Sequence, residues 1–216
     1  NPPRLSERSV RTRPSVMIRT VIFDLGGVYF TDGSAIAIEQ ISATYRLAEA
    51  KVRDIVMGDL GSRYRHGAVT SSQFWEGAVE AWNLQVPTEQ LATTWLQAYK
   101  PIPGTVSLID RLGVAGYELL YLSDNVEDRI EYLEETYGFL HRFKDGVFSH
   151  RVGIRKPNPR IYELVLEKAA HPPAQCLFVD DKPPMLEPAE RMGMAVVAFE
   201  SPSQVETALV GHGLQF

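Results

Sequence analysis

Residues 21–27 read Val-Ile-Phe-Asp-Leu-Gly-Gly, an apolar run that ends in an aspartate and a pair of glycines. This pattern is typical of a buried strand that enters a tight loop. It recurs at residues 119–124, Leu-Leu-Tyr-Leu-Ser-Asp, and at residues 176–181, Cys-Leu-Phe-Val-Asp-Asp. We therefore predict three buried strands that each end in polar residues. A fourth apolar run, residues 195–199, lacks a polar ending, and we expect it to serve the sheet alone.

Segments with helical periodicity lie between these runs. Val126, Ile130, Leu133 and Tyr137, for example, follow the spacing of one apolar helix face. Because strands and helices alternate, we predict an α/β fold whose core is a Rossmann-like parallel sheet covered by helices on both faces. Ligands of such sheets bind at the carboxyl ends of the strands, so the polar strand endings should meet in one crevice.

Residues 33–100 interrupt this alternation, because they show helical periodicity only. Thr70 begins one of these helices, since it precedes Ser-Ser-Gln in the pattern of a capping box. All three tryptophans of the chain lie in this segment, and we assign most of them to its small core. We predict that residues 33–100 form an all-α cap inserted into a core of residues 17–32 and 101–216.

The composition is that of an ordinary globular protein, with 44% hydrophobic and 23% charged residues. No apolar run approaches the roughly 20 residues that cross a bilayer, so we predict no membrane-spanning helix. The formal net charge is −5, although residues 1–16, predicted to be a flexible tail, contain four arginines and one glutamate. The rest of the chain is therefore more acidic still, which argues against binding to nucleic acid.

The single cysteine, Cys176, excludes an internal disulfide and a cysteine-rich zinc site. A chain without disulfides suits a reducing compartment, and we expect a cytoplasmic protein. The apolar neighbours of Cys176 indicate a small core residue rather than a reactive thiol. Monomer and homodimer both stay open, because the apolar positions of the cap could be buried internally or against a second copy.

Four motifs occur in order along the chain, at residues 24–28, 123–125, 153–159 and 180–181. They read Asp-Leu-Gly-Gly-Val, Ser-Asp-Asn, Gly-Ile-Arg-Lys-Pro-Asn-Pro and Asp-Asp. Together they resemble the motifs of the haloacid dehalogenase superfamily, and within it the phosphatases with a small helical cap inserted after the first motif. The resemblance covers nearly everything after Met17. It implies Mg²⁺-dependent hydrolysis of a small phosphorylated metabolite, such as a sugar phosphate.

The resemblance implies a role for each phosphate-binding residue. Asp24 is expected to be the nucleophile that forms an aspartyl-phosphate, and Ser123 and Lys156 are expected to complete the catalytic set. Ser123, Asp124, Asn125 and Lys156 are expected to contact the substrate. The family usually has Asn directly after this Ser or Thr, whereas here Asp124 intervenes and adds negative charge near the phosphate.

A magnesium ion is implied by the same resemblance. Its expected protein ligands are Asp24, the backbone carbonyl of Gly26, Asp180 and Asp181, which supply the oxygen atoms that Mg²⁺ prefers. Asp181 is assigned either to a metal-bound water or to the support of Lys156. Elementary electrostatics points the same way, since two adjacent acids in a dry crevice repel each other unless a cation offsets them.

Gly26 departs from the family pattern, which usually places at this position a second Asp that protonates the leaving group. Loss of a general acid or base typically costs on the order of 10²–10⁴ in rate. One hypothesis is a phosphatase whose leaving group needs little protonation or whose acid comes from the cap. Arg65 and His66 are polar cap residues that could contribute there, although such residues are more often solvated, and His66 is left out of the predicted site.

Two other hypotheses also follow from Gly26. A 2-haloacid dehalogenase would not need the missing acid, because a halide leaves without a proton. Such enzymes of this family need no metal, however, which would leave the pair Asp180 and Asp181 unexplained. The second hypothesis is a catalytically degenerate member of the family that binds a phosphorylated ligand or a protein partner without turnover.

Overall fold

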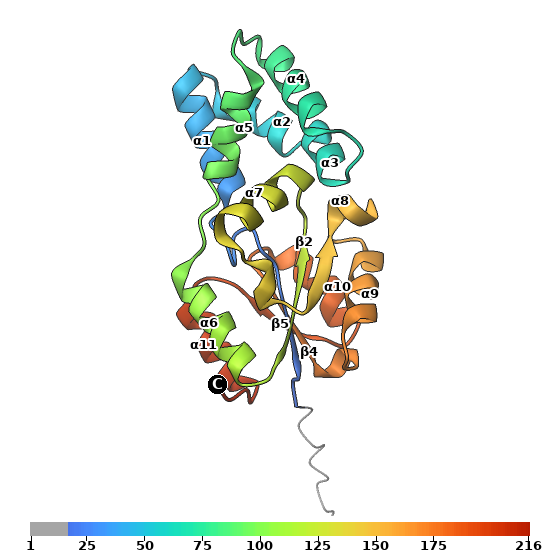
Figure 1. The fold of residues 1–216 in the computed structure, drawn as a ribbon. Coiled ribbons are helices and arrows are strands. Elements are labelled where there is room, and N and C mark those ends of the chain that lie inside the picture. Colours follow the sequence, from blue (N-terminus) through green and yellow to red (C-terminus); the bar gives the residue numbers. More distant parts are fainter. Residues whose placement is uncertain (1–16) are drawn as a thin grey trace, which may run out of the picture.

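The computed structural model describes residues 17–216, and the predicted tail lies outside these described residues. Figure 1 shows a sheet flanked by helices, with a separate group of helices packed at one end of it. The strands are β1 (Thr20–Phe23), β2 (Glu118–Ser123), β3 (Asp145–Phe148), β4 (Cys176–Asp180) and β5 (Ala195–Ala198). They form one sheet in the order β3-β2-β1-β4-β5, with every pair parallel. This arrangement confirms the predicted α/β fold.

Strand β1 lies at the centre of the sheet, between β2 and β4. Phe23 pairs with Tyr121 on one side and with Val179 on the other. The residues that follow these three positions therefore leave the sheet at one edge. The polar endings of the three predicted strands share that edge, as the parallel arrangement requires.

The four apolar runs predict four strands, and the sheet has a fifth, β3. This strand has four residues and includes Gly146, which weakens strand propensity and hides the strand in the sequence. The glycine has a packing role, because a Cβ atom at this position would lie 2.3 Å from the ring of Tyr121. Only a residue without a side chain lets the Tyr121 ring pack flat against β3.

The sheet separates two apolar clusters, since successive side chains of a strand point to opposite faces. Val21 and Phe23 belong to one cluster together with residues of α6 (Pro103–Val114) and α11 (Pro202–Gly211). Ile22 belongs to the other, with residues of α9 (Pro159–Lys168) and α10 (Pro183–Arg191). Figure 1 shows these two helix pairs on opposite sides of the sheet. Burial on both faces explains why the strands read as continuous apolar runs.

Helix α7 (Glu127–Tyr137) follows β2 and lies on the α6 side of the sheet. Its predicted apolar face is buried at Val126, Ile130 and Leu133, whereas Tyr137 is partly exposed.

Three shorter helices complete the core, and they are η1 (Leu140–Arg142), α8 (Ser149–Val152) and η2 (Pro173–Gln175). Cys176 is buried, and burial raises the pKa of its thiol to about 11, as suits a core residue.

Five helices occupy the segment between β1 and α6. They are α1 (Gly33–Tyr45), α2 (Glu49–Val56), α3 (Asp59–Arg65), α4 (Ser71–Trp82) and α5 (Thr88–Gln97). Thr70 and Gln73 form the predicted capping box at the start of α4. All three tryptophans are buried. We keep residues 33–100 as the proposed cap, joined to the core by the short segments that precede α1 and follow α5.

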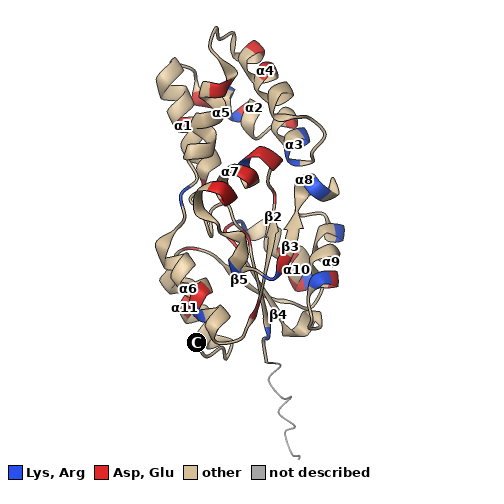
Figure 2. Cartoon of the chain, viewed as in Figure 1, with Lys and Arg blue, Asp and Glu red and all other residues tan. Residues whose placement is uncertain are grey.

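The proposed cap contacts the core next to α7. Figure 2 shows acidic residues gathered on α7 and basic residues on α3 and α8. Asp128 of α7 accepts hydrogen bonds from Tyr64 at 2.5 Å and from Ser71 at 2.8 Å. Ser149 of the core donates to the backbone carbonyl of Arg65 at 2.6 Å. These polar contacts hold the end of α3 over the edge of the sheet. Within residues 17–216, no helix has the length and apolar character to cross a membrane.

Candidate active site

The first motif forms a tight loop directly after β1. The backbone N–H of Asp24 donates to Val179 at 2.9 Å, which continues the pairing of β1 with β4 by one residue. Gly27 has a φ of 88°, and a Cβ atom there would lie 2.5 Å from a carboxylate oxygen of Asp181. Glycine therefore permits both the left-handed turn and the close approach of the fourth motif to the first.

Lys156 connects the first motif to the fourth. Its ammonium nitrogen lies 3.0 Å from Asp24 Oδ1 and 2.5 Å from Asp180 Oδ2, and all three side chains are buried. Although burial lowers the pKa of Lys156, the charges of Asp24 and Asp180 raise it above its ordinary value. The charged form of Lys156 is therefore favoured, and it bridges the carboxylates of Asp24 and Asp180.

The loop that carries Lys156 is held by the second motif. Asp124 Oδ1 accepts from the backbone N–H of Lys156, and Asp124 Oδ2 accepts from Arg155 Nε, each at 3.0 Å. Arg155 also donates to Ser62 of α3 at 2.8 Å. The negative charge of Asp124 is thus neutralised by Arg155, which accounts for an acid at this position beside the predicted phosphate site.

Burial and, to a smaller extent, the charge of Asp180 raise the pKa of Asp24 to about 6 against the opposing effect of Lys156. The carboxylate of Asp24 therefore depends on neighbouring cations to stay ionised near neutral pH. An ionised, poorly solvated carboxylate held by one lysine is a competent nucleophile.

Three carboxylates converge at the edge of the sheet. Asp24, Asp180 and Asp181 each offer an oxygen atom, and these atoms lie within 4.8 Å of one another. Asp181 Oδ1 is buried and has no hydrogen-bond partner among residues 17–216, with Lys182 Nζ 3.6 Å away. Burial and the charge of Asp24 raise the pKa of Asp181. A buried carboxylate oxygen without a donor, beside two further carboxylates, fits a hard divalent cation such as Mg²⁺.

The other members of the second motif lie deeper than Asp124. Ser123 and Asn125 are both buried, and Asn125 Nδ2 lies 3.4 Å from the Ser123 hydroxyl. Asn125 Oδ1 accepts from Arg129 and from the N–H of Val126, each at 3.1 Å. These contacts organise the loop after β2. Neither Ser123 nor Asn125 lines the pocket described below, so their contacts with substrate stay predictions.

A pocket of about 140 Å³ lies over Asp24, between the core and the proposed cap. Its lining residues are Asp24, Gly26, Asp32, Ser34, Met57, Arg65, Tyr99, Asp124, Arg129, Arg155, Lys156, Asp180, Lys182 and Met185. The structure therefore brings together Asp24, Gly26, Asp124, Lys156 and Asp180 from four separate motifs.

Four basic lining residues are absent from the predicted site. Arg155 and Lys182 adjoin predicted residues in the third and fourth motifs, so their position along the chain was an available signal. Arg65 is one of the two cap residues that the sequence names as possible contributors, and it is buried and lines the pocket, whereas His66 does not line it. Arg129 stands among acidic residues, yet it lies three residues after Val126 and four before Leu133, so its place on the predicted apolar face was an available signal.

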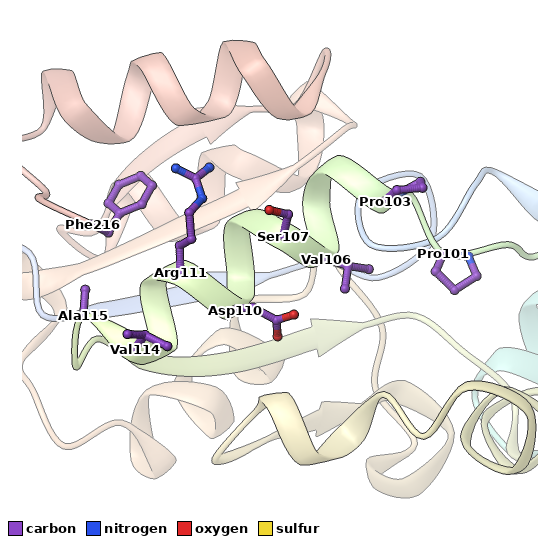
Figure 3. Close-up of a pocket in the computed structure, with 9 residues that line it drawn as sticks. All are labelled: Pro101, Pro103, Val106, Ser107, Asp110, Arg111, Val114, Ala115 and Phe216. Atoms are coloured by element: carbon purple, nitrogen blue, oxygen red, sulfur yellow. The ribbon is translucent and has the colours of Figure 1, made fainter.

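A second, larger cavity of about 720 Å³ lies along α6 and shares no residue with this pocket. Figure 3 shows its lining residues, which are Pro101, Pro103, Val106, Ser107, Asp110, Arg111, Val114, Ala115 and Phe216. Asp110 is paired with Arg142 at 2.8 Å, and Arg111 with Glu206 at 2.6 Å. This mainly apolar groove lacks the cluster of acids and lysine found over Asp24.

Comparison with known proteins identifies the family of this chain. A family model described as haloacid dehalogenase-like hydrolase matches residues 18–193. The chain belongs to this family. The matched range includes all four motifs and the proposed cap, so the candidate pocket lies entirely within the haloacid dehalogenase-like region.

Relatives in the family have low overall identity to this chain. Pyrimidine 5'-nucleotidase YjjG of Escherichia coli is 29% identical over 173 residues, which cover 74% of this chain and 76% of that protein. Sesquiterpene phosphatase astK of Aspergillus oryzae is 27% identical over 188 residues, which cover 82% of this chain and 87% of that protein. The two relatives act on different substrates by name.

Solved structures show the same fold. A haloacid dehalogenase family enzyme from Bacteroides thetaiotaomicron, in complex with magnesium and inorganic phosphate, has a TM-score of 0.71 and 20% identity to this chain. The match covers 85% of this chain and 94% of that chain. The L-2-haloacid dehalogenase of Xanthobacter autotrophicus has a TM-score of 0.64 and 23% identity, over 90% and 83% of the two chains.

Proposed function

We propose that this protein is a Mg²⁺-dependent phosphatase that hydrolyses a small phosphorylated metabolite with Asp24 as a covalent nucleophile. The observation that carries the proposal is the contact of Lys156 with both Asp24 and Asp180 beneath one pocket. The names of the two curated relatives, a nucleotidase and a phosphatase, support hydrolysis of phosphate monoesters.

The side chains of the pocket suit a two-step displacement. Asp24 attacks the phosphorus atom, the bond from phosphorus to the alcohol oxygen breaks, and an aspartyl-phosphate forms. Water then cleaves this intermediate, which releases phosphate and restores the carboxylate. Lys156, 3.0 Å from Asp24, donates to phosphoryl oxygens and offsets their charge during both steps.

Asp24, Asp180, Asp181 and the backbone carbonyl of Gly26 are the residues that would hold Mg²⁺. The ion, when bound, supplies positive charge that offsets the carboxylates and the phosphoryl group. Lys156 supplies one positive charge to two of these acids, so the site needs a further cation when a phosphate dianion enters it. This need favours a metal-dependent phosphatase over a metal-independent dehalogenase.

The group that protonates the leaving alcohol must come from outside the first motif. A Cβ atom at Gly26 would make only an ordinary contact, 3.7 Å from the ring of Tyr99, so the backbone there does not require glycine. Among the pocket carboxylates, Asp24, Asp124 and Asp180 each accept from a lysine or arginine. Asp32 accepts only from the N–H of Ala35, at 3.1 Å. We assign the general acid to Asp32.

Hydrolysis of p-nitrophenyl phosphate tests the proposal, because this leaving group departs without help from an acid. We expect turnover that requires Mg²⁺, is abolished by EDTA and falls on the order of 10³-fold or more in Asp24→Asn. Asp54→Asn is the matched control, since Asp54 is an exposed acid of the cap outside the pocket. Turnover that persists without Mg²⁺, or that is undiminished in Asp24→Asn, contradicts the proposal.

The degenerate alternative makes a different prediction. Such a protein would bind inorganic phosphate, detectable by isothermal titration calorimetry, and would show no turnover of any phosphate ester. That result would replace the enzyme with a phosphate-dependent binding protein.

A further inference from the structure

The charges that line the pocket are paired on one side and unpaired on the other. On the core side, Lys156 contacts Asp24 and Asp180, and Arg155 contacts Asp124. Toward the cap, Arg65 and Arg129 line the same pocket. Neither has an acid within 4.0 Å among the described residues.

Arg129 is the more unusual of the two. Its side chain is 1% exposed, and its guanidinium carbon lies 4.1 Å from the ring centroid of Trp95 and 4.3 Å from that of Tyr99. Nη1 donates to Asn125 Oδ1 at 3.1 Å. Nε and Nη2 are buried and have no hydrogen-bond partner among residues 17–216. These two nitrogens form one edge of the guanidinium plane, so both free donors point the same way.

Arg65 reaches the same region from the end of α3. Its Nη1 donates to the carbonyls of Val56 and Gly61, and its Nη2 lies 3.2 Å from the hydroxyl of Ser34. Burial lowers the pKa of Arg65 to about 10, and the positive charge of Arg129 lowers it as well. Two like charges therefore line one pocket, and neither has an acid of the described residues within 4.0 Å.

Burial of charge without a partner is costly, and contact with aromatic rings offsets only part of the cost. An oxyanion removes that cost, because carboxylate and phosphate groups accept two parallel hydrogen bonds from one edge of an arginine. In the proposed reaction, Lys156 and the metal site of the core offset the charge of the phosphoryl group that reacts at Asp24. The free edge of Arg129 is therefore suited to a second anionic group.

We propose that Arg129, supported by the charge of Arg65, binds a second oxyanion of the substrate. This inference rests on the proposed phosphatase function and narrows it to short phosphate monoesters that also carry a carboxylate or a second phosphate. The pocket of about 140 Å³ is below the roughly 300–1,000 Å³ of typical ligand sites, which favours a compact substrate.

Pairs of esters that differ in one anionic group test the inference. The first pair is 2-phosphoglycolate and ethyl phosphate, and the second is 1,3-propanediol bisphosphate and 3-hydroxypropyl phosphate. We expect kcat/KM of the native protein to favour the doubly anionic member of at least one pair by about tenfold to a hundredfold, the range of charged hydrogen bonds. The pair that shows the preference identifies carboxylate or phosphate as the second group.

Arg129→Met removes the charge and keeps an unbranched side chain between Trp95 and Tyr99. We expect it to bring the ratio of kcat/KM within the preferred pair close to one, and Arg129→Lys to leave an intermediate ratio, because lysine keeps the charge but not the planar edge. Arg63→Met is the matched control, since Arg63 is an exposed arginine of α3 outside the pocket. Its ratio should equal that of the native protein.

A structural role of Arg129 predicts a different pattern, in which both members of a pair lose activity together and the ratio is retained. That pattern, or equal activity of the native protein on both members of both pairs, overturns the inference.

If the native protein turns over no ester, p-nitrophenyl phosphate included, the proposed function is wrong. The inference about Arg129 is then tested by measuring the binding of anions. Isothermal titration calorimetry should then show phosphonoacetate binding about tenfold or more tightly than ethylphosphonate to the native protein but not to Arg129→Met. Equal binding of both probes by the native protein overturns it.

If Arg129→Met fails to fold, as judged by circular dichroism, Arg65→Met takes its place with the same expected loss of preference. A retained preference in that variant counts against the inference.

Discussion

The core side and the cap side of the pocket both bury charge, and they stabilise it differently. On the core side, Lys156 lies 3.0 Å from Asp24 and 2.5 Å from Asp180, so opposite charges from the protein compensate one another. On the cap side, Arg129 is stacked between Trp95 and Tyr99 with two donors left free. On the core side, Asp24, Asp124 and Asp180 are therefore paired with cations of the protein before substrate binds, whereas on the cap side two donors of Arg129 are left for a ligand. The paired charges of the core side suit the reaction that the family has in common. The free donors of the cap side suit the selection of a particular substrate.

Lys156→Met should have the largest effect on the core side of the pocket, because it leaves Asp24 and Asp180 buried without their shared cation. We expect phosphatase activity to fall by at least a hundredfold, since the variant loses the charge that faces the phosphoryl group. Removal of one partner from a buried ion pair typically costs about 3–5 kcal/mol in the free energy of unfolding. Urea denaturation measures this loss. A stability equal to that of the native protein would mean that Lys156 is not holding the two acids together.

Asp181→Asn tests whether the carboxylates of the core side bind the metal ion. The variant keeps the shape of the side chain and removes a charge beside Asp24 and Asp180, so we expect the Mg²⁺ concentration for half-maximal activity to rise about tenfold to a hundredfold. Thermal unfolding at increasing Mg²⁺ provides a second measurement, because an ion that binds only the folded protein raises the transition temperature. An unchanged metal requirement would remove Asp181 from the site.

Asp32→Asn tests the assignment of the general acid at the boundary between the two sides. An acid matters more when the leaving group is a poor one, so activity on ethyl phosphate should fall about tenfold to a hundredfold more than activity on p-nitrophenyl phosphate. Gly26→Asp, placed at a position where a Cβ atom has room, should reduce the difference when combined with Asp32→Asn. Equal losses on both esters would assign Asp32 to the helix cap that it forms with Ala35 instead.

The smallest expected effect comes from Thr70→Ala, which removes the capping box of α4 without touching the pocket. We expect a loss of about 1 kcal/mol in the free energy of unfolding. The ratio of kcat/KM within the preferred pair of esters should be unchanged. A changed ratio would indicate that the stability of the helical segment as a whole, rather than Arg129, decides the preference.

Local pattern predicts most of this molecule and fails at identifiable places. The strands that end in Asp24, Ser123 and Asp180 are apparent because burial on both faces demands continuous apolar runs. Strand β3 is missed because it is short, contains Gly146 and depends on the ring of Tyr121 for its packing. The place of β3 in the sheet depends on its contact with β2, and this contact cannot be predicted from the local sequence of either strand.

The pocket residues divide in the same way. Lys156 and Asp180 are found from motifs, because each follows a local pattern of strand, loop and turn. Arg129 is missed because several residues around it on α7 are acidic, so its side chain reads as one more solvated charge. Only the packing of Trp95 and Tyr99 against α7 removes it from water.

The order of apolar runs, glycines and acids along the chain was enough to predict a parallel sheet and the group of acids at its carboxyl edge, since strand burial and tight turns are local properties. The partners of each charge could not be derived in this way. They depend on side chains from α3, α5 and α7, which are distant in sequence and meet only when the helical segment packs over β1 and β2. The tertiary structure alone therefore decides that one side of the pocket has its charges paired and the other does not.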